Sequence, residues 1–273
     1  EGVMDFTNMY SFKNFVLSIK SAGFISNSLI NSQMTLDFAY TLYLILNKNN
    51  QIDKTQIKHY VSKWYVFSTL TSRYISSPET AMDLDIRRIL DKGFFEYFKE
   101  VEEANLSDNF WEIRLVQGLE TSAINSPFFN VFTAAQVQGN DNSLLMNGLK
   151  VRDLITTMGD IHHVFPKGFL QKNGISDRYK YNQISNYTYL DSQTNKAIGE
   201  KAPNEYFKAV FDQCITKQLQ FGNISDVELL RENLRVNCIP DNIEMMNVTH
   251  YEEYQLERRK LMAKKIKEYY YSL

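Results

Sequence analysis

A pair of adjacent histidines stands in the run Gly159-Asp160-Ile161-His162-His163-Val164-Phe165-Pro166-Lys167. The whole chain holds only 4 histidines, so half of them occupy two neighbouring positions. Histidine serves both as a metal ligand and as a general base near neutral pH. The pair before Phe-Pro-Lys therefore indicates hydrolytic chemistry assisted by a metal ion. Asp160, just upstream, is a further candidate for a supporting role.

The segments around this run predict two short strands and a helix. Residues 158–162 are short enough for one strand, and Asn173-Gly174 supplies a turn. The β-branched and aromatic run Asn186–Leu190 predicts the second strand. A cap at position 191 or 192 then starts a helix that carries Asn195. The predicted unit is thus strand, turn, strand and helix.

This unit holds the side chains that metal-assisted phosphodiester cleavage needs. One group must deprotonate a water, and nitrogen or oxygen ligands must hold a divalent ion against the scissile phosphate. A histidine at a strand end can be the base, and the Asn195 carbonyl on the helix can reach the same ion. In the plainer alternative, one histidine is a core residue and the other lies on the surface. Asn186 and Asn195 then serve only a turn and a helix start.

These residues resemble the ββα-metal, or HNH, nucleases, and within them the C-terminal nuclease domain of GmrSD-type modification-dependent restriction enzymes. That family typically shows His-His-Ile-Phe-Pro-Lys, an Asn-Leu-type strand, Thr-Asn-Lys and Pro-x-x-Tyr. The matching runs here are His162–Lys167, Asn186–Leu190, Thr194–Lys196 and Pro203–Tyr206. The resemblance is strong over about residues 155–210 and weaker in the final helix. The CxxC pairs that bind structural zinc in some HNH enzymes are not in the sequence, so no structural zinc is expected.

The resemblance implies a role for each matched residue. His163 corresponds to the general base. Asn186 corresponds to the middle asparagine, which braces the loop that holds the base. His162 and Asn195 correspond to ligands of one divalent ion, Mg²⁺ or Mn²⁺.

Basic side chains near these residues are candidates for contacts with nucleic-acid phosphates. In the predicted nuclease unit they are Lys167, Lys196 and Lys201. A helix predicted over residues 252–270 carries a basic stripe made of Arg258, Arg259, Lys260, Lys264, Lys265 and Lys267. Plain surface lysines and a solvated helix face are the alternatives for the two groups.

The rest of the chain predicts a mainly α protein, a helical bundle plus the small HNH core. Residues 1–138 predict the helical domain, with helix starts at Asp53, Ser77-Pro78 and Ser126-Pro127. Residues 139–273 predict the nuclease domain with its C-terminal helix. The two Ser-Pro starts could each bind an anion, although simple capping is the better interpretation. Arg73, Arg87 and Arg88 near the first slightly favour a phosphate there.

The composition of the chain limits its possible partners and cellular compartment. The net charge of −2 gives no global basic field, so contacts with DNA must come from a local patch. The 2 cysteines form no paired spacing, which favours a reducing cytoplasm. No apolar run reaches the roughly 18 residues of a membrane span, so no membrane partner is expected.

The chain opens Glu1-Gly2 rather than with Met, and the Asp-Gly-Gln-Gln-Arg run of the family's nucleotide-binding domain is not in the sequence. We therefore expect a fragment whose N-terminal nucleotide-binding or sensor partner lies outside it.

The sequence thus predicts a metal-dependent DNA endonuclease domain that serves restriction or antiphage defence. One such centre cuts one strand, so double-strand cleavage needs two encounters or a homodimer. The alternative from another class is a non-catalytic nucleic-acid-binding or assembly module that keeps the HNH fold. A metalloprotease helix needs His-Glu-x-x-His, and the Phe165-Pro166 that follows the pair would break such a helix.

Overall fold

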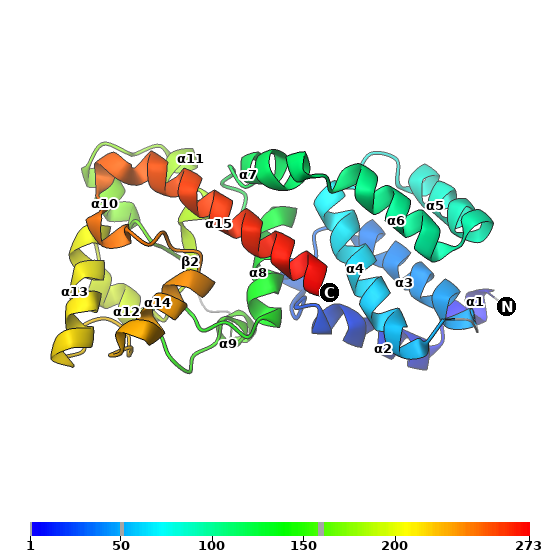
Figure 1. The fold of residues 1–273 in the computed structure, drawn as a ribbon, viewed down its shortest axis with the longest axis horizontal. Helices are drawn as coiled ribbons and strands as arrows, with labels where there is room; N and C mark the ends of the chain where they lie inside the picture. Colours follow the sequence, from blue (N-terminus) through cyan, green and yellow to red (C-terminus); the bar gives the residue numbers. More distant parts are fainter. Residues whose placement is uncertain (1, 50–51, 158–160) are drawn as a thin grey trace. The chain divides into compact units, whose positions relative to one another are not determined.

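The computed structural model describes residues 2–49, 52–157 and 161–273, which are mainly helical with one small sheet (Figure 1). The chain forms two compact units. The first comprises Glu1–Arg114, Asn125–Ala135 and Ile266–Leu273, and the second comprises Leu115–Ile124 and Gln136–Lys265. Relative to the predicted segments 1–138 and 139–273, residues 115–124 and 136–138 fall in the second unit and residues 266–273 in the first.

The first unit is helical. Its elements are α1 (Gly2–Phe6), α2 (Met9–Ser21), η1 (Asn27–Leu29), α3 (Gln33–Lys48), α4 (Lys54–Thr71), α5 (Pro78–Lys92), α6 (Phe94–Asn105) and η2 (Phe110–Arg114). It also holds most of α8 (Pro127–Gln138) and the end of α15 (Tyr251–Ser272). The predicted helix starts at Asp53, Pro78 and Pro127 are confirmed. Asp53 caps α4, whereas Ser77 makes no capping hydrogen bond with its side chain.

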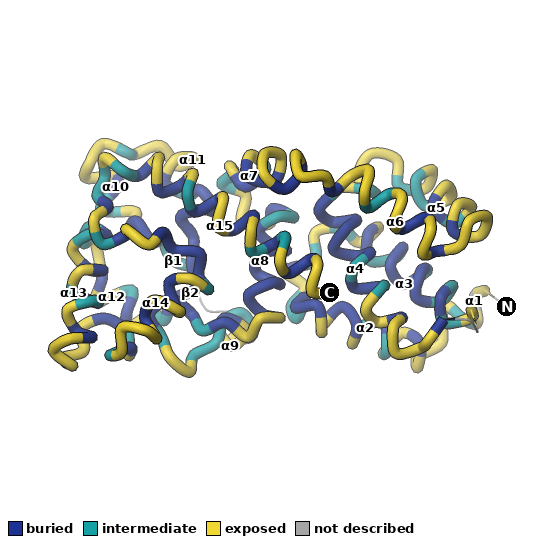
Figure 2. Tube along the Cα trace, in the orientation of Figure 1, coloured by how far each residue is buried: buried dark blue, intermediate teal, exposed yellow. Residues whose placement is uncertain are grey.

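Helix α4 is the centre of this bundle and contacts α2, α3 and α6. Its second half is buried on nearly every side, as the dark tube of Figure 2 shows. A helix half that is buried around nearly its whole circumference must be enclosed by other helices. Trp64, which is 0% exposed, packs there against rings from α3 and α6, with Phe38 and Phe98 among them.

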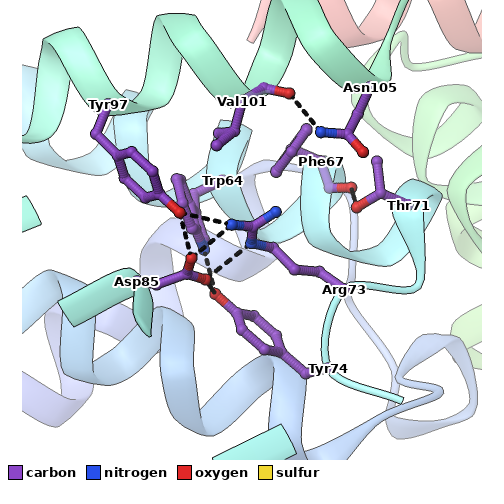
Figure 3. Close-up of polar contacts among 9 residues, drawn as sticks. All are labelled: Trp64, Phe67, Thr71, Arg73, Tyr74, Asp85, Tyr97, Val101 and Asn105. Carbon is purple, nitrogen blue, oxygen red and sulfur yellow. Dashed lines mark hydrogen bonds and ion pairs between the residues drawn. The ribbon is translucent and has the colours of Figure 1, made fainter. Parts of the chain in front are cut away.

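A buried carboxylate ties α5 to this core (Figure 3). Asp85 is 0% exposed and accepts a hydrogen bond from Arg73 Nε at 2.8 Å. The phenols of Tyr74 and Tyr97 each donate to Asp85 at 2.6 Å. The guanidinium of Arg73 also lies 5.6 Å from the Trp64 ring centroid. Arg73 therefore neutralises a core carboxylate, so its charge is already compensated by Asp85 and is not evidence for a phosphate at the start of α5.

The second unit is built around the predicted strands. Its elements are α7 (Leu115–Gly118), α9 (Val151–Thr156), β1 (Ile161–His163), α10 (Lys167–Lys172), α11 (Arg178–Tyr181), η3 (Ile184–Asn186), β2 (Tyr187–Tyr189), α12 (Ser192–Ile198), α13 (Pro203–Thr216), α14 (Val227–Val236), η4 (Ile243–Met245), η5 (Val248–His250) and the first part of α15. The two strands are antiparallel, with Ile161 opposite Tyr189 and His163 opposite Tyr187. Helix α12 follows β2 directly, and Asp191 caps it through the N–H groups of Gln193 and Thr194. The order of strand, strand and helix is as predicted. The predicted turn at Asn173-Gly174 is present, and it lies between two short helices, α10 and α11, that were not predicted.

The basic stripe predicted on α15 is only partly a solvated face. Arg258 is 1% exposed and donates to the carbonyls of Ser185 at 2.9 Å and Asn237 at 3.3 Å. Lys265 forms an ion pair with the buried Asp141 at 2.6 Å. These side chains hold the second unit together, so the stripe as a whole cannot be a surface for DNA.

The described part of the chain contains no helix long and apolar enough to cross a membrane.

Candidate active site

His162 and His163 end β1, and the residues that follow them are anchored in the core. Val164 and Phe165 are 1% and 0% exposed. The phenol of Tyr206 donates a hydrogen bond to the Val164 carbonyl at 2.7 Å. Because close packing and a buried hydrogen bond fix these two residues, the end of the strand has little freedom to move.

Asn186 joins this strand end to the second strand. Its buried side chain accepts a hydrogen bond from the Phe165 N–H at 2.8 Å and donates to the carbonyls of Phe165 at 3.0 Å and Tyr181 at 3.1 Å. Its own main-chain carbonyl accepts from the Val164 N–H at 2.8 Å. These are the contacts that the predicted bracing role requires, while a part for Asn186 in catalysis stays a prediction.

The His163 ring is partly buried at the end of the two-stranded β1–β2 ribbon, which is called the ribbon below. Its Nε2 lies 3.0 Å from Oδ1 of Asn182, just beyond α11. Its ring meets Tyr187 edge to face, with centroids 5.2 Å apart. Since an amide oxygen only accepts, Nε2 carries the proton in this arrangement and the lone pair lies on Nδ1. Nδ1 is therefore the atom that could take a proton from a water.

The surroundings keep the imidazole of His163 neutral. Burial lowers its pKa below the ordinary value, whereas the hydrogen bond with Asn182 acts in the opposite direction. Electrostatic repulsion from the neighbouring His162 and Lys167 lowers the pKa further. A histidine with a lowered pKa is unprotonated at pH 7, which is the form that a general base needs.

The two predicted metal ligands lie on different elements of the same unit. His162 is opposite Thr188 in the ribbon and is partly exposed. Neighbouring residues of a strand face opposite sides, so His162 and His163 do not share one face. Asn195 is partly exposed on α12, the helix that follows the ribbon. Their binding of one ion stays a prediction.

The donor chemistry of this pair suits some ions better than others. Mg²⁺ prefers a complete shell of oxygens, while imidazole nitrogen suits transition ions. His162 and Asn195 therefore fit Mn²⁺ better than Mg²⁺. Across residues 2–49, 52–157 and 161–273, no group of 3 or more His, Cys, Asp or Glu side chains could hold a metal. The candidate pair contributes only one side chain of those types, and Asp160 lies outside the described residues.

The three candidate phosphate-binding lysines differ in their surroundings. Lys167 begins α10 and is exposed, with Nζ 5.3 Å from the Tyr181 ring centroid. Lys196 is exposed near the end of α12. Lys201 donates to the Ala197 carbonyl at 3.0 Å and so caps that helix. Lys201 thus has a local structural contact, and phosphate contact stays a prediction for all three.

Asn182 is the residue of this site that sequence reasoning missed. It lies four positions before Asn186, in a segment for which no element was predicted. The signal available in the sequence is the second asparagine itself, but only the fold of α11 brings it to the imidazole. Its hydrogen bond selects which nitrogen of His163 is left to act as a base.

Comparisons with known proteins add little to this geometry. No protein-family profile matches the chain, and no solved structure matches it. The chain is similar to an uncharacterized protein of Methanocaldococcus jannaschii, with 26% identity over 194 residues. The match covers 69% of this chain and 31% of that relative, so the chain spans about a third of the relative's length. The function must therefore be argued from the site.

Proposed function

We propose that this chain is a metal-dependent endonuclease domain of the HNH type that hydrolyses phosphodiester bonds in DNA. The observation that carries the proposal is the clamp of Asn186 on Phe165, which fixes His163 at the end of the ribbon. A general base needs a fixed position, a neutral form and a lone pair directed away from its supporting contact. The buried hydrogen bonds of Asn186 with Phe165 support the fixed position. The lowered pKa of His163 supports the neutral form, and the hydrogen bond to Asn182 supports a lone pair on the opposite nitrogen.

In the proposed reaction, Nδ1 of His163 takes a proton from a water that attacks the phosphorus. A bond forms between the water oxygen and phosphorus, and the bond from phosphorus to the 3′ oxygen breaks. The leaving oxygen takes a proton from solvent. His162 and Asn195 would hold a divalent ion, whose charge when bound stabilises the phosphate and the leaving oxygen.

An anionic substrate is supported by the exposed lysines of the unit. Lys167 follows the histidine pair on α10, and Lys196 directly follows Asn195 on α12. Each can contribute a phosphate contact without reading the base sequence. Such contacts supply a local basic patch in a chain whose net charge is −2.

The proposal extends to the biological setting. The likeness of the sequence runs to restriction nucleases supports a part in restriction or antiphage defence, with a nucleotide-binding or sensor partner. One centre hydrolyses one strand, so cleavage of both strands requires a second copy or a second encounter.

The proposed activity is tested by converting supercoiled plasmid into nicked circles at increasing Mn²⁺ concentrations. The unchanged chain should nick the plasmid, and His162→Ala or Asn195→Ala should each need at least about tenfold more Mn²⁺ for half-maximal cleavage. Lys172→Ala, which removes an exposed ion pair with Glu200, is the control and should need no more Mn²⁺ than the unchanged chain. An identical Mn²⁺ dependence for all four proteins would contradict the ligand assignment.

A further inference from the structure

A cavity of about 410 Å³ lies in the helical first unit, among residues of α3, α4, α5 and α8. The starts of three of these helices line it, through Ser32 for α3, Pro78 for α5 and Pro127 for α8. The helices have 16, 15 and 12 residues, so each is long enough to carry a helix dipole. Three partly positive helix ends therefore converge on one cavity.

Side-chain contacts at the edge of the cavity hold the starts of α3 and α8 together. Asn31, just before α3, donates to the main-chain carbonyl of Asn125 and accepts from the Asn130 side chain at 2.6 Å. These contacts attach the first turn of α8 to the start of α3. At α5, Ser77 makes no capping hydrogen bond with its side chain. Pro78, the first residue of α5, has no N–H, so the donors that α5 can offer an anion are the amides of the residues after it in the first turn.

A second observation points to a ligand. Ser68 of α4 lines the cavity and is 0% exposed. Among the described residues, its hydroxyl has no hydrogen-bond partner. A buried hydroxyl without a partner costs free energy, so such a group in a stable core needs an explanation. An oxyanion in the cavity would give this hydroxyl an acceptor.

The groups near the cavity that would repel an anion, namely the carbonyls at the end of α4 and the Asp85 carboxylate, already have partners. Helix α4 ends there, but its Ser68 and Thr69 carbonyls accept from the N–H groups of Arg73 at 3.0 Å and Ser72 at 3.4 Å. Tyr74, another lining residue, donates its hydroxyl to Asp85, and that carboxylate is neutralised by Arg73 (Figure 3). Within the described lining, no residue carries a charge.

We propose that this cavity is a binding site for a phosphate group, either of a free nucleotide or of a nucleic-acid strand. It goes beyond the proposed nuclease centre, because it uses none of the residues of the ribbon. The three helix starts supply the attraction, and the Ser68 hydroxyl supplies one hydrogen bond. The cavity volume is within the range of small-ligand sites.

The site is tested by isothermal titration calorimetry of the 273-residue chain with inorganic phosphate, adenosine monophosphate and a short DNA strand. The matched variants are Ser72→Asp and Ser72→Asn, since Ser72 is exposed at the cavity and has a φ of 54°, which both residues tolerate. Ser72→Asp adds a negative charge at the site and should weaken phosphate binding at least about tenfold. Ser72→Asn should bind like the unchanged chain, and Ser68→Ala should lose about tenfold in affinity without unfolding.

The outcomes separate the sources of the phosphate. Binding of adenosine monophosphate more tightly than inorganic phosphate, with loss in Ser72→Asp, assigns the site to nucleotides. Binding of DNA alone with the same loss assigns it to a strand. Binding that Ser72→Asp leaves unchanged, or no saturable binding of any probe, would overturn the proposal. None of these results depends on cleavage, so they are separate from the test of the nuclease.

Discussion

Asn186 holds both main-chain polar groups of Phe165, two positions beyond His163. Its Oδ1 accepts from the Phe165 N–H at 2.8 Å, and its Nδ2 donates to the Phe165 carbonyl at 3.0 Å. A single amide can form this two-way contact because it has a donor and an acceptor side by side. The position of the candidate base is therefore set from η3, just before the neighbouring strand β2, as well as by its own strand.

Asn186→Ala should destabilise the chain by about 2–5 kcal/mol, because it leaves three buried main-chain groups of Phe165 and Tyr181 without their partner. Urea unfolding followed by circular dichroism measures this. Asn173→Ala, which loses one exposed side-chain bond on α10, is the control and should change stability by less than about 1 kcal/mol. Equal stability of the two variants would show that the clamp does not hold the ribbon.

Asn182 should set the pH at which His163 becomes a base. Its hydrogen bond raises the pKa of His163 against the lowering effect of burial. Asn182→Ala removes that contribution, so the pKa should fall and the rise of cleavage with pH should begin at lower pH. Asn182→Asp places a carboxylate beside the ring. It should raise the pKa of His163, and the rise of cleavage should then begin at higher pH. NMR titration of the imidazole gives the pKa independently of cleavage, and shifts in the same direction for both variants would refute this account.

Two lysines of the nuclease unit should respond differently to removal. Lys196→Ala should weaken DNA binding and lower the salt dependence of binding by about one phosphate contact, with stability unchanged. Lys201→Ala removes a helix cap on Ala197 and should lower the melting temperature. Fluorescence anisotropy at several salt concentrations, together with thermal melts, separates the two effects. A Lys196→Ala variant that binds DNA like the unchanged chain would remove Lys196 from the proposed interface.

The buried ion pair of the first unit should matter far more than a surface pair on the same helix. Asp85→Asn leaves the Arg73 guanidinium without its carboxylate and should cost about 3–5 kcal/mol. Asp83→Asn breaks the exposed pair with Arg87 and should cost less than about 1 kcal/mol. Urea unfolding compares them directly, and similar costs would mean that the Asp85 network is not a core element.

Local signals in the sequence predicted the starts of helices well. Asp53 caps α4, Pro78 and Pro127 are the first residues of α5 and α8, and Asp191 caps α12. These signals work because capping and the fixed φ of proline act within one turn. The order of the two strands and α12 also followed from local pattern.

Contacts between distant segments were not predictable in the same way. The basic stripe on α15 looked solvated, yet Arg258 is buried among carbonyls that come from η3 and the end of α14. Charge periodicity does not say which face of a helix meets the core. The helices α10 and α11 have 6 and 4 residues, too short for a periodic signal. Asn182 was missed for that reason, since α11 is what brings it to His163.

The most direct measurement of the central claim is plasmid nicking by the unchanged chain, His163→Ala and His59→Ala, each with Mn²⁺ and with a chelator. His59 is an exposed histidine of α4 and serves as the matched control. The account predicts nicking by the unchanged chain and by His59→Ala that requires the ion, and a loss of at least about 100-fold in His163→Ala. Nicking that His163→Ala retains in full, or no nicking by the unchanged chain, would contradict the claim that His163 is the base of a nuclease.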